Sequence, residues 1–160
     1  MTLEEIVSRF GLATKAKLSN PAAVGQPEDQ LRGPLEALVE ALAALAGLPD
    51  EATKLVGETT LADIATRPDF SVTVQGALVG FIEVKAPGKG SDPRRFTDAH
   101  DKAQWAKLKS LPNLIYTDGA SFNLWRDGKL HTGPITLDGD IATAGAKLKA
   151  PPALVQRLPR

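Results

Sequence analysis

The sequence of 160 residues has no cysteine and only two histidines, His100 and His131. The absence of cysteine excludes disulfide bonds and thiolate metal sites, and it fits a reducing compartment, so we expect a cytoplasmic protein. The two histidines are too few and too far apart in the sequence to predict a zinc site. The sequence therefore predicts neither a disulfide-stabilised fold nor a zinc site.

Long hydrophobic runs and an excess of one charge are also absent. No apolar run is long enough to span a membrane, and Met1 is followed by Glu4 and Glu5 rather than by a basic and then an apolar segment. We therefore expect no membrane association and no signal peptide. The formal net charge is zero, which argues against a strong autonomous nucleic-acid binder. The length and the 42% hydrophobic content are typical of one compact globular domain.

Two β-rich segments in the middle of the chain predict a hairpin. Phe70–Val74 alternates apolar with polar residues, a period of two that predicts a strand. Leu78–Val84 is almost entirely apolar, as expected of a central strand covered on both faces. Asp69 begins the first segment, whereas Glu83 and Lys85 end the second. Three charged side chains beside a buried run cost free energy unless they bind something.

The loop of this hairpin decides which side chains meet. A two-residue turn at Gly76 and Ala77 would pair Asp69 with Val84 and place Asp69 on the opposite face from Glu83. An odd loop centred on Gly76 pairs Asp69 with Glu83 instead, and we predict this three-residue, bulged loop. Two carboxylates on opposite faces would indicate a fold of another kind.

Two neighbouring carboxylates can hold a hard divalent cation such as Mg²⁺, and a lysine beside them can orient an attacking water. The pattern Asp, then Glu-x-Lys on the next strand, stands here as Pro68-Asp69 and Glu83-Val84-Lys85. It resembles the motif of the PD-(D/E)xK nuclease superfamily. The alternative is a surface hairpin that carries an ordinary Glu–Lys neighbour pair.

The resemblance implies roles for these residues. Asp69 and Glu83 would ligate Mg²⁺, for which Mn²⁺ can substitute, and the Val84 carbonyl would be a further ligand. Lys85 would position or activate water. The implied reaction is in-line attack on a phosphodiester that leaves 5′-phosphate and 3′-hydroxyl ends.

A helix is predicted over Pro27–Ala46, with an interruption at Gly33–Pro34. Many superfamily members carry a glutamate on the first core helix near the metal. Glu28 matches that position, so the resemblance implies that it assists at the metal. The alternative is a first-turn acid that pairs with Arg32, four residues on.

A second helix is predicted over Thr97–Leu111. Several branches of the superfamily carry a glutamine on this helix, and Gln104 matches it, which implies that Gln104 orients Lys85, the water or a phosphate. The alternative is an ordinary exposed glutamine. We expect a face of small residues to approach the sheet closely: Ala99, Ala103, Ala106 and Ser110.

Basic residues are concentrated next to the candidate site. Residues 84–110 contain seven lysines and arginines and three aspartates. Lys89, in a glycine-rich loop, and Arg94 and Arg95 after it are candidates for contacts with DNA phosphates. Solvated surface charge is the alternative.

The elements give the order αβββαβ, the α/β core of the resembled superfamily, with a central mixed sheet flanked by helices. We expect an N-terminal arm over residues 1–26 with a short helix ended by Gly11, a nuclease core over 27–132, and a C-terminal extension or linker over 133–160. The other strands are expected at Thr53–Val56, Asn113–Thr117, Phe122–Arg126 and, as an edge strand, Lys129–Thr132.

The resemblance is closest to the N-terminal endonuclease modules of restriction–modification enzymes, both type I restriction subunits and fused nuclease–methyltransferase types. It implies a metal-dependent endonuclease that acts on double-stranded DNA. Methyltransferase, helicase or specificity domains outside this chain would be its partners, and a dimer on DNA would serve duplex cleavage. The alternative is a catalytically weak or inactive module that docks DNA or protein.

Overall fold

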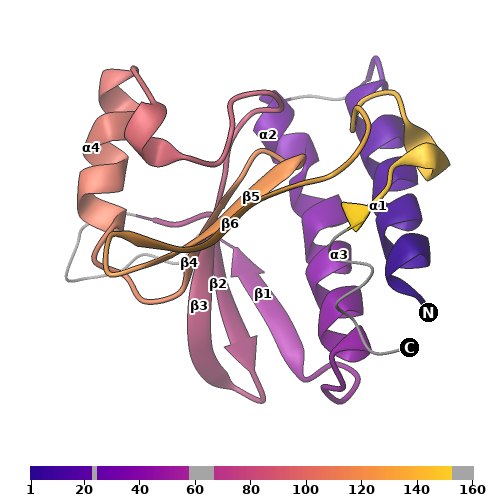
Figure 1. Cartoon of the computed structure of the whole chain (residues 1–160), viewed down its shortest axis with the longest axis horizontal. Helices are drawn as coiled ribbons and strands as arrows, with labels where there is room; N and C mark the ends of the chain where they lie inside the picture. The colour runs from indigo at the N-terminus through magenta and orange to yellow at the C-terminus, as the bar shows by residue number, and fades with distance from the viewer. Residues whose placement is uncertain (23–24, 58–66, 153–160) are drawn as a thin grey trace.

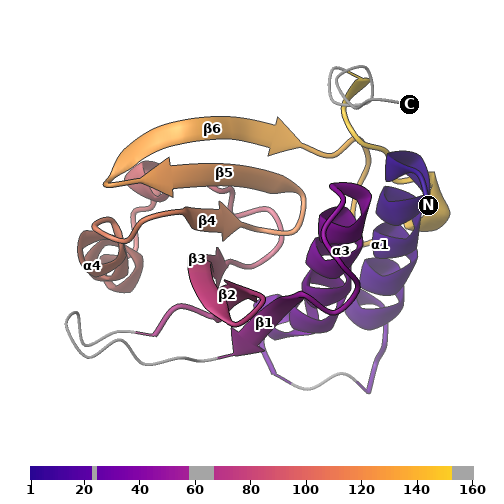
Figure 2. The ribbon, with the colours of Figure 1, turned by 90° about the horizontal axis from the view of Figure 1, so that it is seen from below.

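The computed structural model describes residues 1–22, 25–57 and 67–152. In this part of the chain one six-stranded sheet has α4 (Ala99–Leu108) on one face and α1 (Leu3–Leu18) and α3 (Arg32–Leu45) on the other (Figures 1 and 2). The strands are β1 (Thr53–Gly57), β2 (Phe70–Val74), β3 (Ala77–Val84), β4 (Leu114–Thr117), β5 (Ser121–Arg126) and β6 (Lys129–Thr136).

The strands lie in the sheet in their sequence order. Only β3 and β4 pair in parallel within the described residues, and α4 makes the crossover that a parallel connection requires. The run α3, β1, β2, β3, α4, β4 is the expected αβββαβ order. The expected α/β class, with a mixed sheet flanked by helices, is confirmed.

The β2–β3 hairpin reaches the expected register by a different route. Its turn has two residues, Gln75 and Gly76, both with positive φ (50° and 82°), rather than three. Such a turn matches the twist of the strands. The register then shifts between Val72 and Thr73, so that β3 carries one extra residue. This bulge restores the odd count, and Phe70 lies opposite Ile82, which brings Asp69 next to Glu83.

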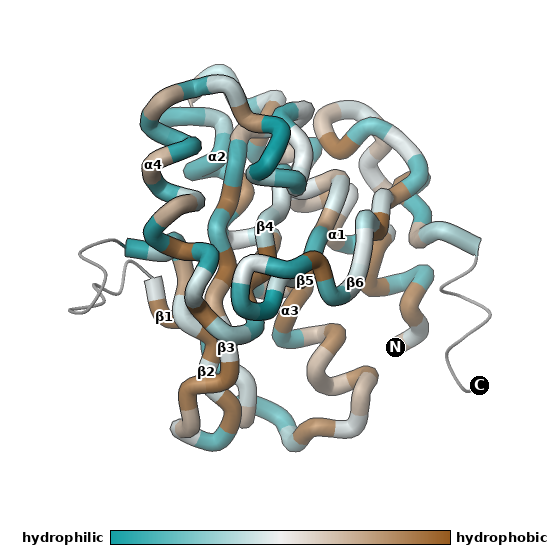
Figure 3. The backbone as a smooth tube through the Cα atoms, turned by 60° about the vertical axis from the view of Figure 1, so that its left-hand side comes forward, coloured by the Kyte–Doolittle hydropathy of each residue, from teal (hydrophilic) through white to brown (hydrophobic). Residues whose placement is uncertain are grey.

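Each face of the sheet buries its own hydrophobic cluster. The cluster under α1 and α3 includes Phe10, Leu35 and Ile82. The cluster under α4 is smaller and mostly aromatic. Figure 3 shows hydrophobic segments along β3 that continue to the turn end of its hairpin, where Leu78 and Val79 are exposed. The α4 cluster comprises Phe81, Phe96, Leu108, Leu114, Tyr116 and Trp125.

The N-terminal segment is not the arm that the sequence suggested. Helix α1 begins at a capping box formed by Thr2 and Glu5 and continues through Gly11 to Leu18. A Cβ at Gly11 would lie 2.0 Å from the carbonyl oxygen of Gly145, so this glycine admits a crossing segment instead of ending the helix. The helix packs into the core of the domain through its buried face.

The interruption of the second helical segment falls at Leu31 rather than at Gly33–Pro34. It separates α2 (Pro27–Gln30) from α3. Pro34 is the third residue of α3, where an amide N–H would have no partner in the helix, so the proline is tolerated there.

The segment after residue 132 also contributes to the core. Strand β6 runs on to Thr136, four residues beyond the expected edge strand. The chain then makes a bridge between Asp138 and Lys149 and a short 3₁₀ helix, Gly145–Lys147, beside α1. Leu137, Ile141 and Leu148 are buried in the cluster under α1 and α3. No helix within the described residues is long and apolar enough to cross a membrane.

Candidate functional site

Asp69 and Glu83 lie side by side where the β2–β3 hairpin opens. The backbone N–H of Asp69 donates to Oε2 of Glu83 (3.3 Å), and the N–H of Val84 donates to Oδ2 of Asp69 (2.7 Å). The side chain of Glu83 is 5% exposed and that of Asp69 is 18% exposed. Two acids thus share one largely buried position, as the predicted register requires.

Lys85 and Gln104 complete a hydrogen-bonded cluster with Glu83. Nζ of Lys85 lies 2.6 Å from Oε1 of Gln104 and 3.7 Å from Oε1 of Glu83. Nε2 of Gln104 donates to that same Oε1 of Glu83 (3.1 Å). Gln104 is therefore no ordinary exposed glutamine, because its amide bridges the lysine and the glutamate.

Asp101 is a further acid of the site that the sequence did not single out. Its Oδ1 accepts a hydrogen bond from Nζ of Lys85 (3.0 Å), and its Oδ2 pairs with Lys89 of the glycine-rich loop. This buried carboxylate thus holds two lysines. The loop is anchored from its other side, where the N–H of Gly90 donates to Asp118 (2.8 Å).

The face of α4 that meets the sheet differs from the expected one. The four small residues expected there, Ala99, Ala103, Ala106 and Ser110, are exposed. Asp101, Gln104, Trp105 and Leu108 point to the sheet instead, at the spacing of one helix face. Large aromatic side chains of the sheet fill the space under α4 and keep the helix from the close approach to the sheet that small residues would allow.

The electrostatics of the site follow from burial and from the paired acids. Burial, and next the charge of Asp69, raises the pKa of Glu83 to about 8. Burial and then the charge of Glu83 raise the pKa of Tyr116, whose hydroxyl has no hydrogen-bond partner among the described residues. For Asp101, burial opposes a fall in the pKa, but the hydrogen bonds from Lys89 and Lys85 outweigh it and lower the pKa.

Arg32 is the second residue that the sequence did not place in the site. Its Nη2 lies 2.7 Å from Oδ1 of Asp69. The sequence offered Glu28 as a partner for Arg32, and no hydrogen bond or ion pair joins the two among the described residues. Glu28 itself is half-buried near the start of α2 and makes no such contact with Asp69 or Glu83 in that part of the chain. Its assisting role stays a prediction.

The two arginines after the glycine-rich loop, Arg94 and Arg95, are exposed. Arg94 pairs with Asp92 (2.9 Å), and its guanidinium lies 4.9 Å from the ring centre of Trp125. The side chain of Arg95 is 88% exposed. Both have access to a ligand, but contact with DNA stays a prediction.

The described donor set offers a hard cation a few oxygen ligands rather than a complete cage of protein side chains. Within residues 1–22, 25–57 and 67–152, no three aspartate, glutamate, histidine or cysteine side chains group as metal ligands. Asp69 and Glu83 contribute two carboxylates, to which the Val84 carbonyl would add an oxygen. Mg²⁺ is often held by one or two carboxylates with waters and substrate phosphate, so this set fits that cation.

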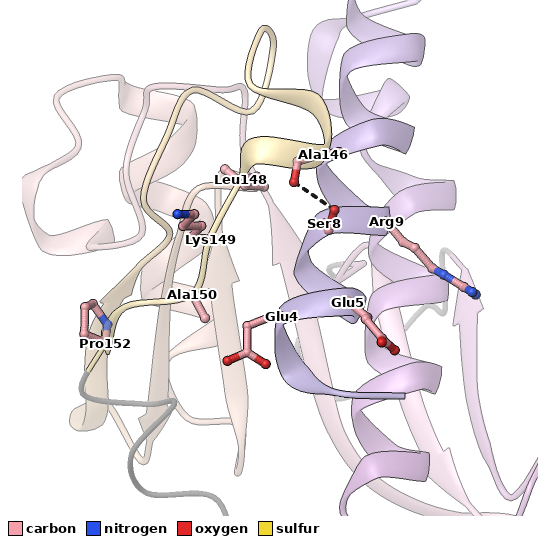
Figure 4. Close-up of a pocket in the computed structure, with 9 residues that line it drawn as sticks. All are labelled: Glu4, Glu5, Ser8, Arg9, Ala146, Leu148, Lys149, Ala150 and Pro152. Atoms are coloured by element: carbon pink, nitrogen blue, oxygen red, sulfur yellow. Dashed lines mark hydrogen bonds between the residues drawn. The ribbon is translucent and has the colours of Figure 1, made fainter.

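The chain also has a cavity of about 760 Å³ between α1 and residues 146–152 (Figure 4). Ser8 closes one side by donating from Oγ to the carbonyl of Ala146 (2.8 Å). Glu4, Arg9 and Lys149 are among its lining residues, and it shares none with the carboxylate cluster. The size of this cavity is therefore no indication of where the chemistry of this protein takes place.

Fold and cluster together define an α/β domain with paired acids and a lysine where a central hairpin opens. No protein-family model and no curated protein matches the sequence. Among solved structures, the chain is similar to one in a cryo-EM structure of a DrdV–DNA complex, with a TM-score of 0.60 and 18% identity over 96% of this chain and 94% of that chain. At this identity the likeness shows the fold.

Proposed function

We propose that this chain is a Mg²⁺-dependent DNA endonuclease domain, the cleavage module of a restriction–modification system. The observation that carries the proposal is the hydrogen-bonded cluster in which Asp69 and Glu83 adjoin Lys85. The similar fold in the DrdV–DNA complex supports DNA as the partner, because that structure contains DNA.

Asp69 and Glu83, with the carbonyl of Val84, would hold the cation. When bound, Mg²⁺ would acidify a water and offset charge on a phosphate oxygen, and Mn²⁺ would substitute. The chain's own contribution is to hold these oxygens together. The Val84 N–H fixes the carboxylate of Asp69, and the Gln104 amide fixes that of Glu83.

Lys85 would orient the attacking water and offset negative charge that develops on the phosphate. Hydrogen bonds to Asp101 and Gln104 hold its ammonium group in place, so the side chain is already in the conformation that contacts the cluster. Such preorganisation is what makes a charged group effective in catalysis. Gln104 acts as a positioning residue, because its amide sets the spacing between Lys85 and Glu83.

Lys89, Arg94 and Arg95 would contact DNA phosphates around this centre. With a formal net charge of zero, the chain would draw most of its DNA affinity from methyltransferase, helicase or specificity domains. One centre cuts one strand, so duplex cleavage would need a second copy on the DNA or a second cleavage event.

A docking module without catalysis is the second candidate. The observation that favours it is that all four carboxylate oxygens of Asp69 and Glu83 already lie within hydrogen-bond distance of a protein donor. Such a centre is complete without a metal. The protein would then keep the fold for contact with DNA or with another protein.

Cleavage of supercoiled plasmid in Mg²⁺ or Mn²⁺ at low salt separates the two candidates. The wild type should nick the plasmid, EDTA should stop it, and Asp69→Asn and Lys85→Met should each reduce the rate by about a hundredfold or more. Asp127→Asn is the matched control, because it makes the same change at an exposed turn residue with positive φ. Cleavage that persists in Asp69→Asn would contradict the proposal. DNA binding without cleavage by the wild type would favour the docking module.

A further inference from the structure

Arg32 reaches the carboxylate cluster from the other side of the sheet. It is the first residue of α3, which lies on the face opposite α4 (Figure 2). Its guanidinium nevertheless contacts Oδ1 of Asp69 at 2.7 Å, and the two side chains are 29% and 18% exposed. A cation of the protein thus sits on one of the two acids proposed to bind metal.

The local structure around Arg32 does not favour a cation. The first turn of a helix carries partial positive charge, which disfavours a basic side chain there. Neighbouring groups offset the positive charge of Arg32. Its Nε lies 3.7 Å from Oδ1 of Asp29, and its guanidinium lies 5.8 Å from the ring centre of Phe70. Its ion pair with Asp69 therefore compensates an unfavourable position at the helix start.

The two oxygens of Asp69 are held in different ways. Oδ2 accepts from the backbone N–H of Val84, which is fixed because β3 is paired on both sides. Oδ1 accepts from Arg32, a contact that depends on the torsions of a long side chain and not on the paired backbone. Of the two contacts, only the one with Arg32 is both charged and exchangeable.

We propose that Arg32 is a resident cation that competes with divalent metal for Oδ1 of Asp69. Metal binding then requires that the guanidinium leave the carboxylate. This inference rests on the proposed function, because it assumes that Asp69 is a metal ligand.

A phosphate group offers the released guanidinium a new partner, since arginine binds phosphate oxygens well. Both ligands favour the state in which Arg32 has left Asp69. Metal and DNA would therefore each increase the affinity for the other, as thermodynamic linkage requires. In the absence of DNA, Arg32 keeps metal affinity low.

Titration of the DNA-free protein with Mn²⁺ by calorimetry tests this competition without an activity assay. Arg32→Met removes the charge and keeps an apolar stem of similar length. We expect it to bind Mn²⁺ about tenfold more tightly than the wild type, the equivalent of one charge-assisted hydrogen bond. Arg9→Met, the same change on α1, should bind like the wild type. Asp69→Asn should lose the binding.

A second measurement uses the unaltered side chain. In ¹⁵N NMR spectra, the guanidinium signals of Arg32 should shift when Mg²⁺ is added to the wild type and stay in place in Asp69→Asn. This readout does not depend on the folding of an Arg32 variant.

The outcomes are distinguishable. Unchanged or weaker Mn²⁺ binding by Arg32→Met, with binding that still needs Asp69, would overturn the role of Arg32 and leave the metal centre intact. Mn²⁺ binding that survives in Asp69→Asn, or that is absent from every variant, would overturn the metal centre and this inference with it.

Discussion

Glu83 should make the stability of the metal-free protein fall as the pH rises. Burial, and then the charge of Asp69, raises its pKa from 4.5 to about 8. A group with a raised pKa in the folded state contributes stability that is complete below its unfolded pKa and is lost as the pH rises through the folded pKa. The loss should therefore fall between about pH 4.5 and pH 8.

The size of this effect follows from the shift. One pKa unit corresponds to about 1.4 kcal/mol, so the full shift at a side chain that is 5% exposed amounts to on the order of 5 kcal/mol. Glu83→Gln removes the titration and keeps an oxygen that can accept from Gln104. The difference in unfolding free energy between wild type and variant isolates Glu83, because the other titrating residues occur in both.

Urea unfolding in EDTA at several pH values from about 5 to about 8.5 measures this difference, because these values span most of the range over which Glu83 titrates. We expect the wild type to lose stability relative to Glu83→Gln as the pH rises. Added Mg²⁺ should reduce that loss, because the cation takes the place of the proton. Parallel curves for the two proteins in EDTA would refute the assignment of a buried, protonated Glu83.

Three further changes follow from the packing. Asp101→Ala should lower the unfolding free energy by about 3 kcal/mol, because it leaves a buried lysine without its acid, whereas Lys102→Ala on the exposed side of α4 should change it by less than about 0.5 kcal/mol. Gly80→Ala should destabilise by about 1–3 kcal/mol, because its Cβ would lie 2.6 Å from the backbone oxygen before β4. Gly33→Ala, with open space around it, should stabilise α3 by about 0.5–1 kcal/mol. Each value can be read from urea unfolding curves.

The order of elements and the central pairing could be predicted from local patterns. Alternation in Phe70–Val74 and the apolar run in β3 are properties of short segments, and the pairing of Asp69 with Glu83 follows once they form a hairpin. The turn type could not be predicted, since a two-residue turn with a bulge and a three-residue loop place the site residues alike. The sequence could therefore predict which residues of β2 and β3 share a face, but it could not predict the turn and the bulge that produce this register.

The residues that reach the site from elsewhere were harder to predict. Asp101 lies three residues before Gln104 on one helix face, a signal that a search for paired acids and bases on α4 could have used. Arg32 had no such signal, because its contact with Asp69 depends on how α3 meets the start of β2. A glycine such as Gly11 predicts a helix end from the sequence alone, because its close contact with Gly145 exists only once α1 packs against the 3₁₀ helix.

The bulge in the β2–β3 hairpin bears on how this part of the chain can change length in evolution or design. Residues added or removed in pairs at the turn leave the inward and outward faces of both strands in phase at the carboxylates. A single insertion or deletion inverts that phase unless the extra residue of β3 is lost or gained in compensation. The length of the hairpin is therefore constrained to steps of two, and the positive φ values of Gln75 and Gly76 restrict which residues its tip can carry.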